Sequence, residues 1–292
     1  MTVISLQEFE SEELLAVKPT RNKAEYCWTC SSSTVLYAIQ RFNLDHGVYL
    51  DADLLFFSSP QVIFEEIEKA NASVAITKHF MLNKDLAGEF CVHFVYFKND
   101  ADGRKALQWW RDSCIDWCFA RYENGKYGDQ RYLESFAAKF KNVLVIKNRG
   151  AGVAPWNMRQ YKYLNNYEFV HKDKTYPVVF FHYHGTRINV ENNNLVLKAI
   201  TYDIPKVAKD LFFMPFLVSY KSVCETYFGI KVNNLIIKNR KWHEKLYSFT
   251  KRIIKSLNVS RVHRAYYFLV KKRYEGYEQN TIYQGEYAQK GS

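Results

Sequence analysis

Two aspartates one residue apart, Asp51 and Asp53, follow an apolar run in the stretch GVYLDADLLFFSSP, residues 47–60. In an extended chain, side chains two residues apart point to the same side. A carboxylate pair among apolar neighbours is costly unless a cation meets it. Hard divalent cations take carboxylate ligands and leave positions for phosphate oxygens, so the pair predicts a Mn²⁺ or Mg²⁺ site that also holds a diphosphate. The alternative is an acid pair at the start of the next helix.

A sheet must position this pair. The first 200 residues alternate apolar runs with helical patterns, which predicts an α/β fold. Ligands of such sheets bind at the carboxyl ends of the strands, where both carboxylates can reach one point. Strands are expected at residues 2–6, 47–57, 73–77, 91–99, 142–146 and 177–184. Helices are expected at residues 31–42 with Ser31 to Ser33 as caps, and at 59–70, 102–122 and 130–140.

The bulk composition permits a large folded domain. Hydrophobic residues make up 48% and aromatic residues 17% of the 292 positions, which excludes a disordered chain. No run of eighteen apolar residues predicts a membrane-spanning helix, and the start MTVISLQEFE is not typical of a secretory signal. We therefore expect a cytoplasmic protein with six reduced cysteines. These favour small core residues over a structural zinc site built from the Cys27/Cys30 and Cys114/Cys118 pairs.

The stretch YLDADLLFFSSP resembles the metal-binding strand end of glycosyltransferases with the GT-A fold. More closely, the chain is similar to bacterial glycosyltransferases related to the glycogenin-like, retaining family eight. Over residues 1–200 the other motifs follow in the family's order: FVYFKND (94–100), YGDQRYLESF (127–136), GAGVAPWN (150–157) and FHYHG (181–185). The resemblance implies a GT-A-type mixed sheet flanked by helices in a catalytic domain of residues 1–204.

The function implied by this resemblance is metal-dependent transfer of a sugar in surface-polysaccharide synthesis. The donor would be a nucleotide-diphosphate sugar, most simply a UDP-sugar, and the acceptor a saccharide or a lipid-linked saccharide. Asp51 would meet the ribose or the metal, and Asp53 and His182 would bind the metal, since imidazole accepts such ions beside oxygen ligands. His184, two residues on, would lie at the substrate or exchange roles with His182. Either histidine alone is otherwise a hydrogen-bonded core residue.

The resemblance places further residues around the donor. Asp129 and Gln130 would lie at the donor sugar and carry the catalytic role. If transfer inverts configuration, Asp129 is the expected general base; if it retains configuration, the leaving phosphate can take the proton. The alternative for Asp129 is the N-cap of the next helix in a surface turn. Gly152 and Trp156 would contact phosphate or sugar, and Arg21 the diphosphate, unless Arg21 belongs to a solvated charge cluster.

Two features of the sequence depart from that family. Cys91, Val92 and His93 stand where relatives have an asparagine-containing turn, so contacts to the acceptor are expected to differ. The amino end is short, because a nucleotide-binding half-sheet has at least two strand–helix units before the acidic pair, and only residues 2–6 are expected to form a strand there. The alternative function is therefore a truncated, non-catalytic GT-A remnant that binds a saccharide or a partner.

The last third of the chain is strongly basic. Residues 206–273 hold sixteen Lys or Arg against three acids, within a net charge of +11 for the whole chain. From residue 235 to residue 255 basic and apolar side chains are interleaved, which is typical of an amphipathic helix that suits an anionic membrane surface. We expect a basic helical region at 205–276 and a polar tail at 277–292. A solvated helical cap is the alternative, and no motif favours nucleic acid.

Overall fold

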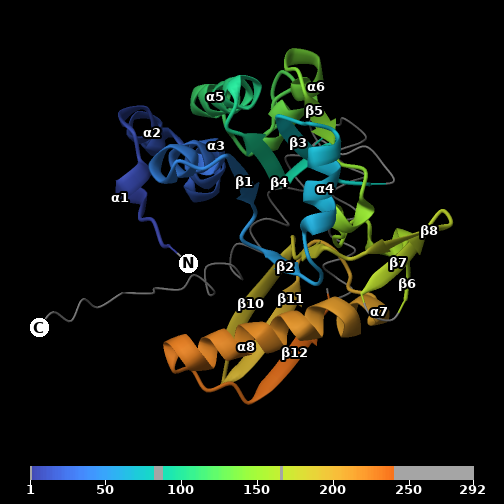
Figure 1. Ribbon diagram of the computed structural model, residues 1–292. Helices are drawn as coiled ribbons and strands as arrows, with labels where there is room; N and C mark the ends of the chain where they lie inside the picture. The colour runs from blue at the N-terminus through green and yellow to red at the C-terminus, as the bar shows by residue number, and fades with distance from the viewer. Residues whose placement is uncertain (1, 82–87, 165–166, 240–292) are drawn as a thin grey trace, which may run out of the picture. The chain divides into compact units, whose positions relative to one another are not determined.

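A mixed four-stranded sheet of order β1-β4-β3-β5 lies at the centre of the first half of the chain (Figure 1). The computed structural model describes residues 2–81, 88–164 and 167–239. β4 is antiparallel to both of its neighbours, whereas β5 runs parallel to β3. The strands are β1 (His46–Leu50), β3 (Val74–Lys78), β4 (Phe90–Lys98) and β5 (Val143–Val145).

Helices cover both faces of this sheet, because its inner strands are apolar on both sides. Val74 and Ile76 of β3 face a core cluster with α3 (Lys23–Phe42) and α5 (Ala101–Asp116). Ala75 between them faces the other cluster, with α4 (Gln61–Lys69). The short helices η2 (Gln130–Ser135) and α6 (Phe136–Lys139) add to the first cluster, and η3 (Arg149–Gly152) to the second.

The strand expected at residues 47–57 is divided at the acidic pair. β1 ends at Leu50, and β2 (Leu54–Phe56) leaves the four-stranded sheet to pair antiparallel with β9 (Phe180–His182). In this register Leu54 lies opposite His182. The chain therefore turns at residues 51–53, and the turn carries both aspartates to the strand that bears the histidine.

The strand expected at residues 2–6 does not form. Ser5 instead begins the short helix α1 (Leu6–Phe9) in a capping box with Glu8. α1 is followed by α2 (Glu12–Val17) and the 3₁₀ turn η1 (Lys18–Thr20).

The next helix begins earlier than expected. Asn22 caps α3, since its Oδ1 accepts hydrogen bonds from the backbone amides of Ala24 and Glu25, both at 3.0 Å. Ser31 to Ser33 are consequently buried inside a helix rather than at its start. The helix does not begin at the serines, because an asparagine with a glutamate three residues later makes a complete capping box upstream.

A third hydrophobic cluster lies under the strands that follow β9 in the chain. β10 (Thr186–Glu191), β11 (Asn194–Ala199) and β12 (Asn234–Lys238) form a three-stranded sheet, and α8 (Met214–Phe228) lies across it (Figure 1). Phe181 of β9 shares this cluster with Phe212 and Phe213. The remaining elements here are β6 (Lys162–Tyr163), β7 (Glu168–His171) and β8 (Lys174–Pro177) in one small sheet, η4 (Met158–Gln160), α7 (Lys206–Ala208) and the π-helix η5 (Lys209–Phe213). The fold is thus mixed α/β with several small sheets.

The basic helical region expected at residues 205–276 is helical over residues 206–228, in α7, η5 and α8, but the amphipathic helix expected from residue 235 does not begin as a helix. Residues 234–238 form a strand that pairs parallel with β11, and Leu235 and Ile237 pack against the third cluster. An apolar run with two isoleucines beside an open strand edge gains ladder hydrogen bonds that outweigh its helical pattern. Residues 206–232 also share their core with residues 153–199, so the described chain has no boundary at 204. The rest of the expected amphipathic helix and the polar tail lie outside the described residues.

Within the described part of the chain, no helix is long and apolar enough to cross a membrane.

Gly103 lets the first turn of α5 lie directly against the sheet. A Cβ at this position would overlap the carbonyl oxygen of Lys98 and lie 2.9 Å from that of Ser73. We predict that Gly103→Ala lowers the free energy of unfolding by about 1–3 kcal/mol through overpacking, although alanine is the better helix former. Urea denaturation measures this. Lys105→Ala, exposed on the same helix, should change stability by less than about 0.5 kcal/mol; equal effects would contradict the packing role of Gly103.

Candidate functional site

The two aspartates and the histidine predicted from the sequence meet at one point. His182 Nε2 lies 3.0 Å from Asp53 Oδ1 and 3.7 Å from Asp51 Oδ2. The β2–β9 register causes this meeting, because it sets residue 182 opposite residue 54. His182 is buried, whereas 21% of the Asp51 side chain and 46% of the Asp53 side chain are exposed. The acidic pair is therefore open to a ligand on one side and held by an imidazole on the other.

His184 belongs to the same group. Asp53, His182 and His184 each offer a ligand atom, and these atoms lie within 4.8 Å of one another. The His184 residue keeps surface in contact with solvent, but the protein atoms around its ring displace much of the water there. This desolvation, together with the charge of His182, lowers the pKa of His184. Both histidines are therefore within reach of a cation at Asp53, and the geometry keeps either assignment open.

The surroundings treat the two aspartates differently. Burial raises the pKa of Asp51, against the lowering effect of His182 and of the Tyr49 hydroxyl, which donates a hydrogen bond to Asp51 Oδ1 at 3.1 Å. Burial also acts to raise the pKa of Asp53, but the hydrogen bond and charge of His182 outweigh it, and the net shift is downward. Asp53 is thus the stronger candidate for a permanently charged ligand.

A cavity of about 380 Å³ opens beside this cluster. Trp28, Tyr127 and Tyr202 supply aromatic walls. The predicted residues that line it are Asp51, Asp53, Asp129, Gln130, Trp156, His182 and His184. Most of the sequence-predicted site therefore faces one space.

Asp129 is the N-cap residue of η2, as the alternative predicted, although its side chain makes no capping hydrogen bond. It is buried with 3% of its surface exposed, so it does not lie on the surface as that alternative supposed. Its Oδ2 accepts a hydrogen bond of 2.7 Å from the Ser31 hydroxyl, and its carbonyl accepts one of 2.9 Å from Trp110 Nε1. Burial raises the pKa of Asp129 to about 7, and the charge of Asp51 adds to that effect. A carboxyl that titrates near neutrality can take up or release a proton at the cavity wall.

Trp156 lines the cavity beside the two histidines. Its Nε1 donates a hydrogen bond of 2.7 Å to the carbonyl of His79. Its ring centroid lies 5.2 Å from that of His182 and 5.7 Å from that of His184, in edge-to-face contacts. The indole is thus fixed at its polar end and packs against the rings that border the acidic pair.

Two predicted contacts are not part of the cavity lining. Arg21 Nη2 donates a hydrogen bond of 3.1 Å to the carbonyl of Ile115, and its guanidinium lies 3.9 Å from the centre of the Phe119 ring. A cation suits the carboxyl end of α5, where carbonyls lack helical partners, so Arg21 is held there and does not line the cavity. Its diphosphate role stays a prediction.

Gly152 is packed rather than open to the cavity. A Cβ there would lie 3.3 Å from both the Lys78 carbonyl and the Phe80 ring, and its own carbonyl accepts a hydrogen bond from Asn157 Nδ2 at 2.6 Å. The glycine serves the close approach of two backbone segments, and the predicted phosphate or sugar contact is not found there.

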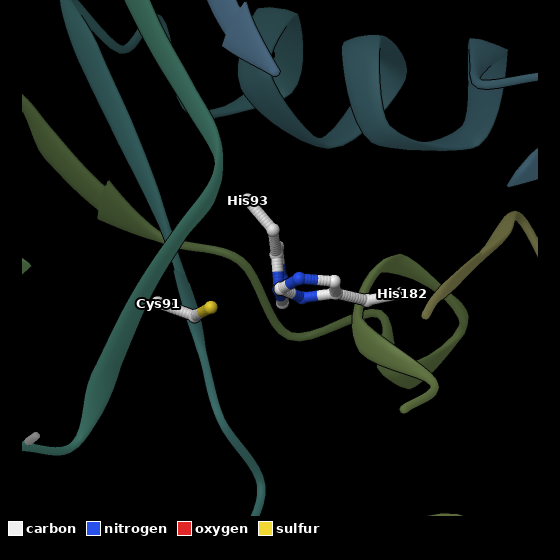
Figure 2. Close-up of side chains that lie close together, drawn as sticks. All are labelled: Cys91, His93 and His182. Atoms are coloured by element: carbon white, nitrogen blue, oxygen red, sulfur yellow. The ribbon is translucent and has the colours of Figure 1, made fainter. Parts of the chain in front are cut away.

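Sequence reasoning missed a second group beside the first. Cys91 and His93 of β4 point toward His182 (Figure 2), and one ligand atom from each lies within 4.8 Å of the others. His93 is fully buried, and burial holds its pKa well below the usual range, so the ring is neutral. The alternation along β4 could have indicated that residues 91 and 93 share a face, but no motif indicated what that face meets.

Two proteins of Bacillus subtilis (strain 168) are similar to this chain. The uncharacterized protein YfnD is 33% identical over 230 residues, which cover 76% of this chain and 72% of YfnD. The uncharacterized protein YfnF is 30% identical over 201 residues, or 64% of this chain and 65% of YfnF. No family model and no solved structure matches the chain.

Proposed function

This chain belongs to the family of YfnD from Bacillus subtilis, and we propose that it is a metal-dependent glycosyltransferase of the GT-A type. The proposed reaction moves a sugar from a nucleotide-diphosphate donor, a UDP-sugar in the first instance, to a saccharide or lipid-linked acceptor of surface-polysaccharide synthesis. The observation that carries the proposal is the convergence of Asp51, Asp53 and His182 at the edge of a cavity.

The chemistry of this group fits a hard divalent cation. Two carboxylates and one neutral imidazole are ligands that Mn²⁺ accepts and that leave positions for phosphate oxygens. Asp53 and His182 would hold the ion, with Asp51 as a further ligand or as the partner of the ribose. When bound, the ion would neutralise the charge of the departing nucleoside diphosphate.

The residues around the cavity support a sugar ligand. A volume of about 380 Å³ is at the lower end of small-molecule sites, which hold roughly 300–1,000 Å³. Trp156 offers an apolar face of the kind on which sugar rings pack, and Asp129 offers a carboxylate to hydroxyl groups. Gln130 borders the same space and would lie at the reacting carbon. In an inverting reaction Asp129, with a pKa of about 7, would remove the acceptor proton; a retaining reaction, which the family resemblance implies, does not need it to.

The fold gives weaker support than the site. A mixed sheet flanked by helices, with the acidic pair directly after a strand, is the arrangement expected of a GT-A domain. The proposal therefore depends on the ligand cluster, and the metal and nucleotide are what an experiment should test first.

We predict that UDP binds at least about tenfold more tightly with Mn²⁺ than with chelator, a difference of about 1.4 kcal/mol, because the ion links the carboxylates to the diphosphate. Isothermal titration calorimetry of the full chain measures this, with uridine as the control that lacks phosphates. Absence of UDP binding at millimolar concentration with Mn²⁺ would contradict the proposal and favour a non-catalytic, saccharide-binding protein.

A further inference from the structure

Cys91 and His93 lie on the side of the His182 ring that faces away from the aspartates; Cys91, His93 and His182 are called the inner site. Nε2 of His182 faces the aspartates, whereas its Nδ1 lies 3.3 Å from Nδ1 of His93. Cys91 and His93 come from β4, and His182 ends β9, so two strands bring the three side chains together (Figure 2). The imidazole of His182 thus has a different set of neighbours at each of its two nitrogens.

The spacing within this cluster fits a tetrahedral metal. Two imidazole nitrogens at about 2.05 Å from zinc, at the tetrahedral angle, are about 3.3 Å apart, and a thiolate sulfur and a nitrogen are about 3.6 Å apart. The two Nδ1 atoms already have the first separation, and all three ligand atoms lie within 4.8 Å of one another. A small movement of the Cys91 side chain would complete the set.

The buried polar groups of the cluster are also poorly satisfied without an ion. Nε2 of His93 is buried and makes no hydrogen bond of ordinary geometry in the part of the chain that the structure describes, although the backbone of Ala151 lies close enough to act on the pKa of the ring. Its other nitrogen meets only another imidazole nitrogen, which can share one proton with it. Buried imidazoles in cores ordinarily pair with a carboxylate, a carbonyl or water. These two face each other and a thiol, which is the composition of a metal site.

We propose that Cys91, His93 and His182 form a second metal site that takes zinc. Thiolate and imidazole ligands select Zn²⁺ over Mn²⁺ and Mg²⁺, which prefer oxygen. Cys91 lines the cavity, so an ion has an entry path and a water has room as fourth ligand. On binding, the thiol would release its proton to solvent and the sulfur would bond to the metal.

The two sites share His182, and this has a regulatory consequence that rests on the proposed function. A neutral imidazole bound to zinc through Nδ1 carries its proton on Nε2. That N–H can donate to Asp53 Oδ1, 3.0 Å away, but cannot bind a cation there. Zinc in the inner site should therefore weaken Mn²⁺ at the aspartates and inhibit the transferase.

Co²⁺ substitution tests the inner site without substrate. The full chain loaded with one equivalent of Co²⁺ should show a thiolate-to-metal absorption band in the near ultraviolet. Cys91→Ser and Cys91→Ala should abolish the band and weaken Zn²⁺ binding by more than about a hundredfold, beyond the 10–100-fold that outer partners of a metal contribute. Near-ultraviolet circular dichroism before metal addition shows which of the two variants keeps the native packing.

Two control variants locate the signal. Cys27→Ser removes an exposed thiol and should keep the band. Asp53→Asn should keep it too, because it changes a hydrogen-bond partner of His182 but removes no ligand of the inner site. A wild-type protein without the band, or a band that persists in a folded Cys91 variant, would overturn the inner site. If the band is present in the wild type and in Asp53→Asn but the wild type does not bind UDP with Mn²⁺, the proposed function fails and the zinc site stands.

The competition is measured with Mn²⁺, whose electron paramagnetic resonance signal weakens on binding. One equivalent of Zn²⁺ should release Mn²⁺ from the wild type and leave it bound in the Cys91 variants. Equal release from both proteins would contradict the sharing of His182.

Discussion

Asp53→Asn is expected to lower Mn²⁺-dependent sugar transfer or donor hydrolysis by at least about a hundredfold, more than the loss of an outer partner of a metal ligand costs. The amide keeps the size of the side chain but removes the negative charge that a cation requires. Asp53 is the appropriate residue because His182 lies 3.0 Å away and holds its pKa down, so that it is charged throughout the neutral range. Product formation from a panel of nucleotide sugars measures the effect.

The same substitution at an unrelated carboxylate separates the metal role from a general loss of charge. Asp112 lies on an exposed part of α5, and 60% of its side chain is accessible. Asp112→Asn should keep the wild-type rate. If Asp53→Asn transfers sugar as fast as Asp112→Asn at saturating Mn²⁺, the aspartate is not a ligand in the reaction.

Asp129→Asn is expected to stabilise the metal-free protein at pH 8 relative to the wild type. The folded state raises the pKa of Asp129 from an ordinary value near 3.8 to about 7. Between these values the folded protein binds a proton that the unfolded chain does not, so wild-type stability falls as the pH rises. At about 1.4 kcal/mol per pH unit the loss amounts to at most about 4 kcal/mol. The asparagine is neutral at every pH and can still accept the Ser31 hydrogen bond.

Urea denaturation of both proteins at pH 5 and pH 8, in chelator, measures this difference. The gain of Asp129→Asn over the wild type should be present at pH 8 and much smaller at pH 5, where both side chains are neutral in the fold. Asp116→Asn, on a side chain that is 77% exposed, should follow the wild type. A pH-independent difference for Asp129→Asn would mean that the buried carboxyl is not the group that titrates.

The pH dependence of the transfer rate gives a second, independent test of Asp129. If Asp129 acts as a base, transfer should increase as the pH rises through about 7, since only the carboxylate accepts a proton. Stability and activity would then change in opposite directions over the same range. This is the pattern expected when a carboxyl is kept buried for its chemistry rather than for the fold.

Patterns that depend on neighbours in the chain could be read directly from the sequence. β3 and β4 are apolar runs because both faces of the inner strands are covered, and eight of the nine β4 residues are buried. The helix expected at residues 59–70 is confirmed as α4, which follows Pro60 as its N-cap residue. The acidic pair itself was recognisable because two carboxylates between apolar runs need a partner.

Competition between neighbouring signals was harder to judge. Asn22 and Glu25 form a capping box upstream of Ser31 to Ser33, the serines that were expected to begin the helix, and the more complete cap determined the start of α3. At residues 234–238 an apolar run with two isoleucines pairs with the edge of β11, a contact that no local pattern reveals. In both places the local pattern was present, but a competing interaction, a more complete helix cap or a strand pairing, stabilised a different structure more strongly.

The chain alone identifies the groups that could do chemistry: Asp51 and Asp53 after a strand, a histidine in FHYHG, and an acid before a helix. Which of them meet depends on the packing of the folded protein. The register of β2 against β9 places His182 at the aspartates, burial raises the pKa of Asp129 against the effect of its Ser31 hydrogen bond, and the carbonyls at the end of α5 hold Arg21 outside the cavity lining. These contacts join residues about 90 to 130 positions apart, and strand register, burial and helix-end polarity across such separations are properties of packing rather than of local order in the chain.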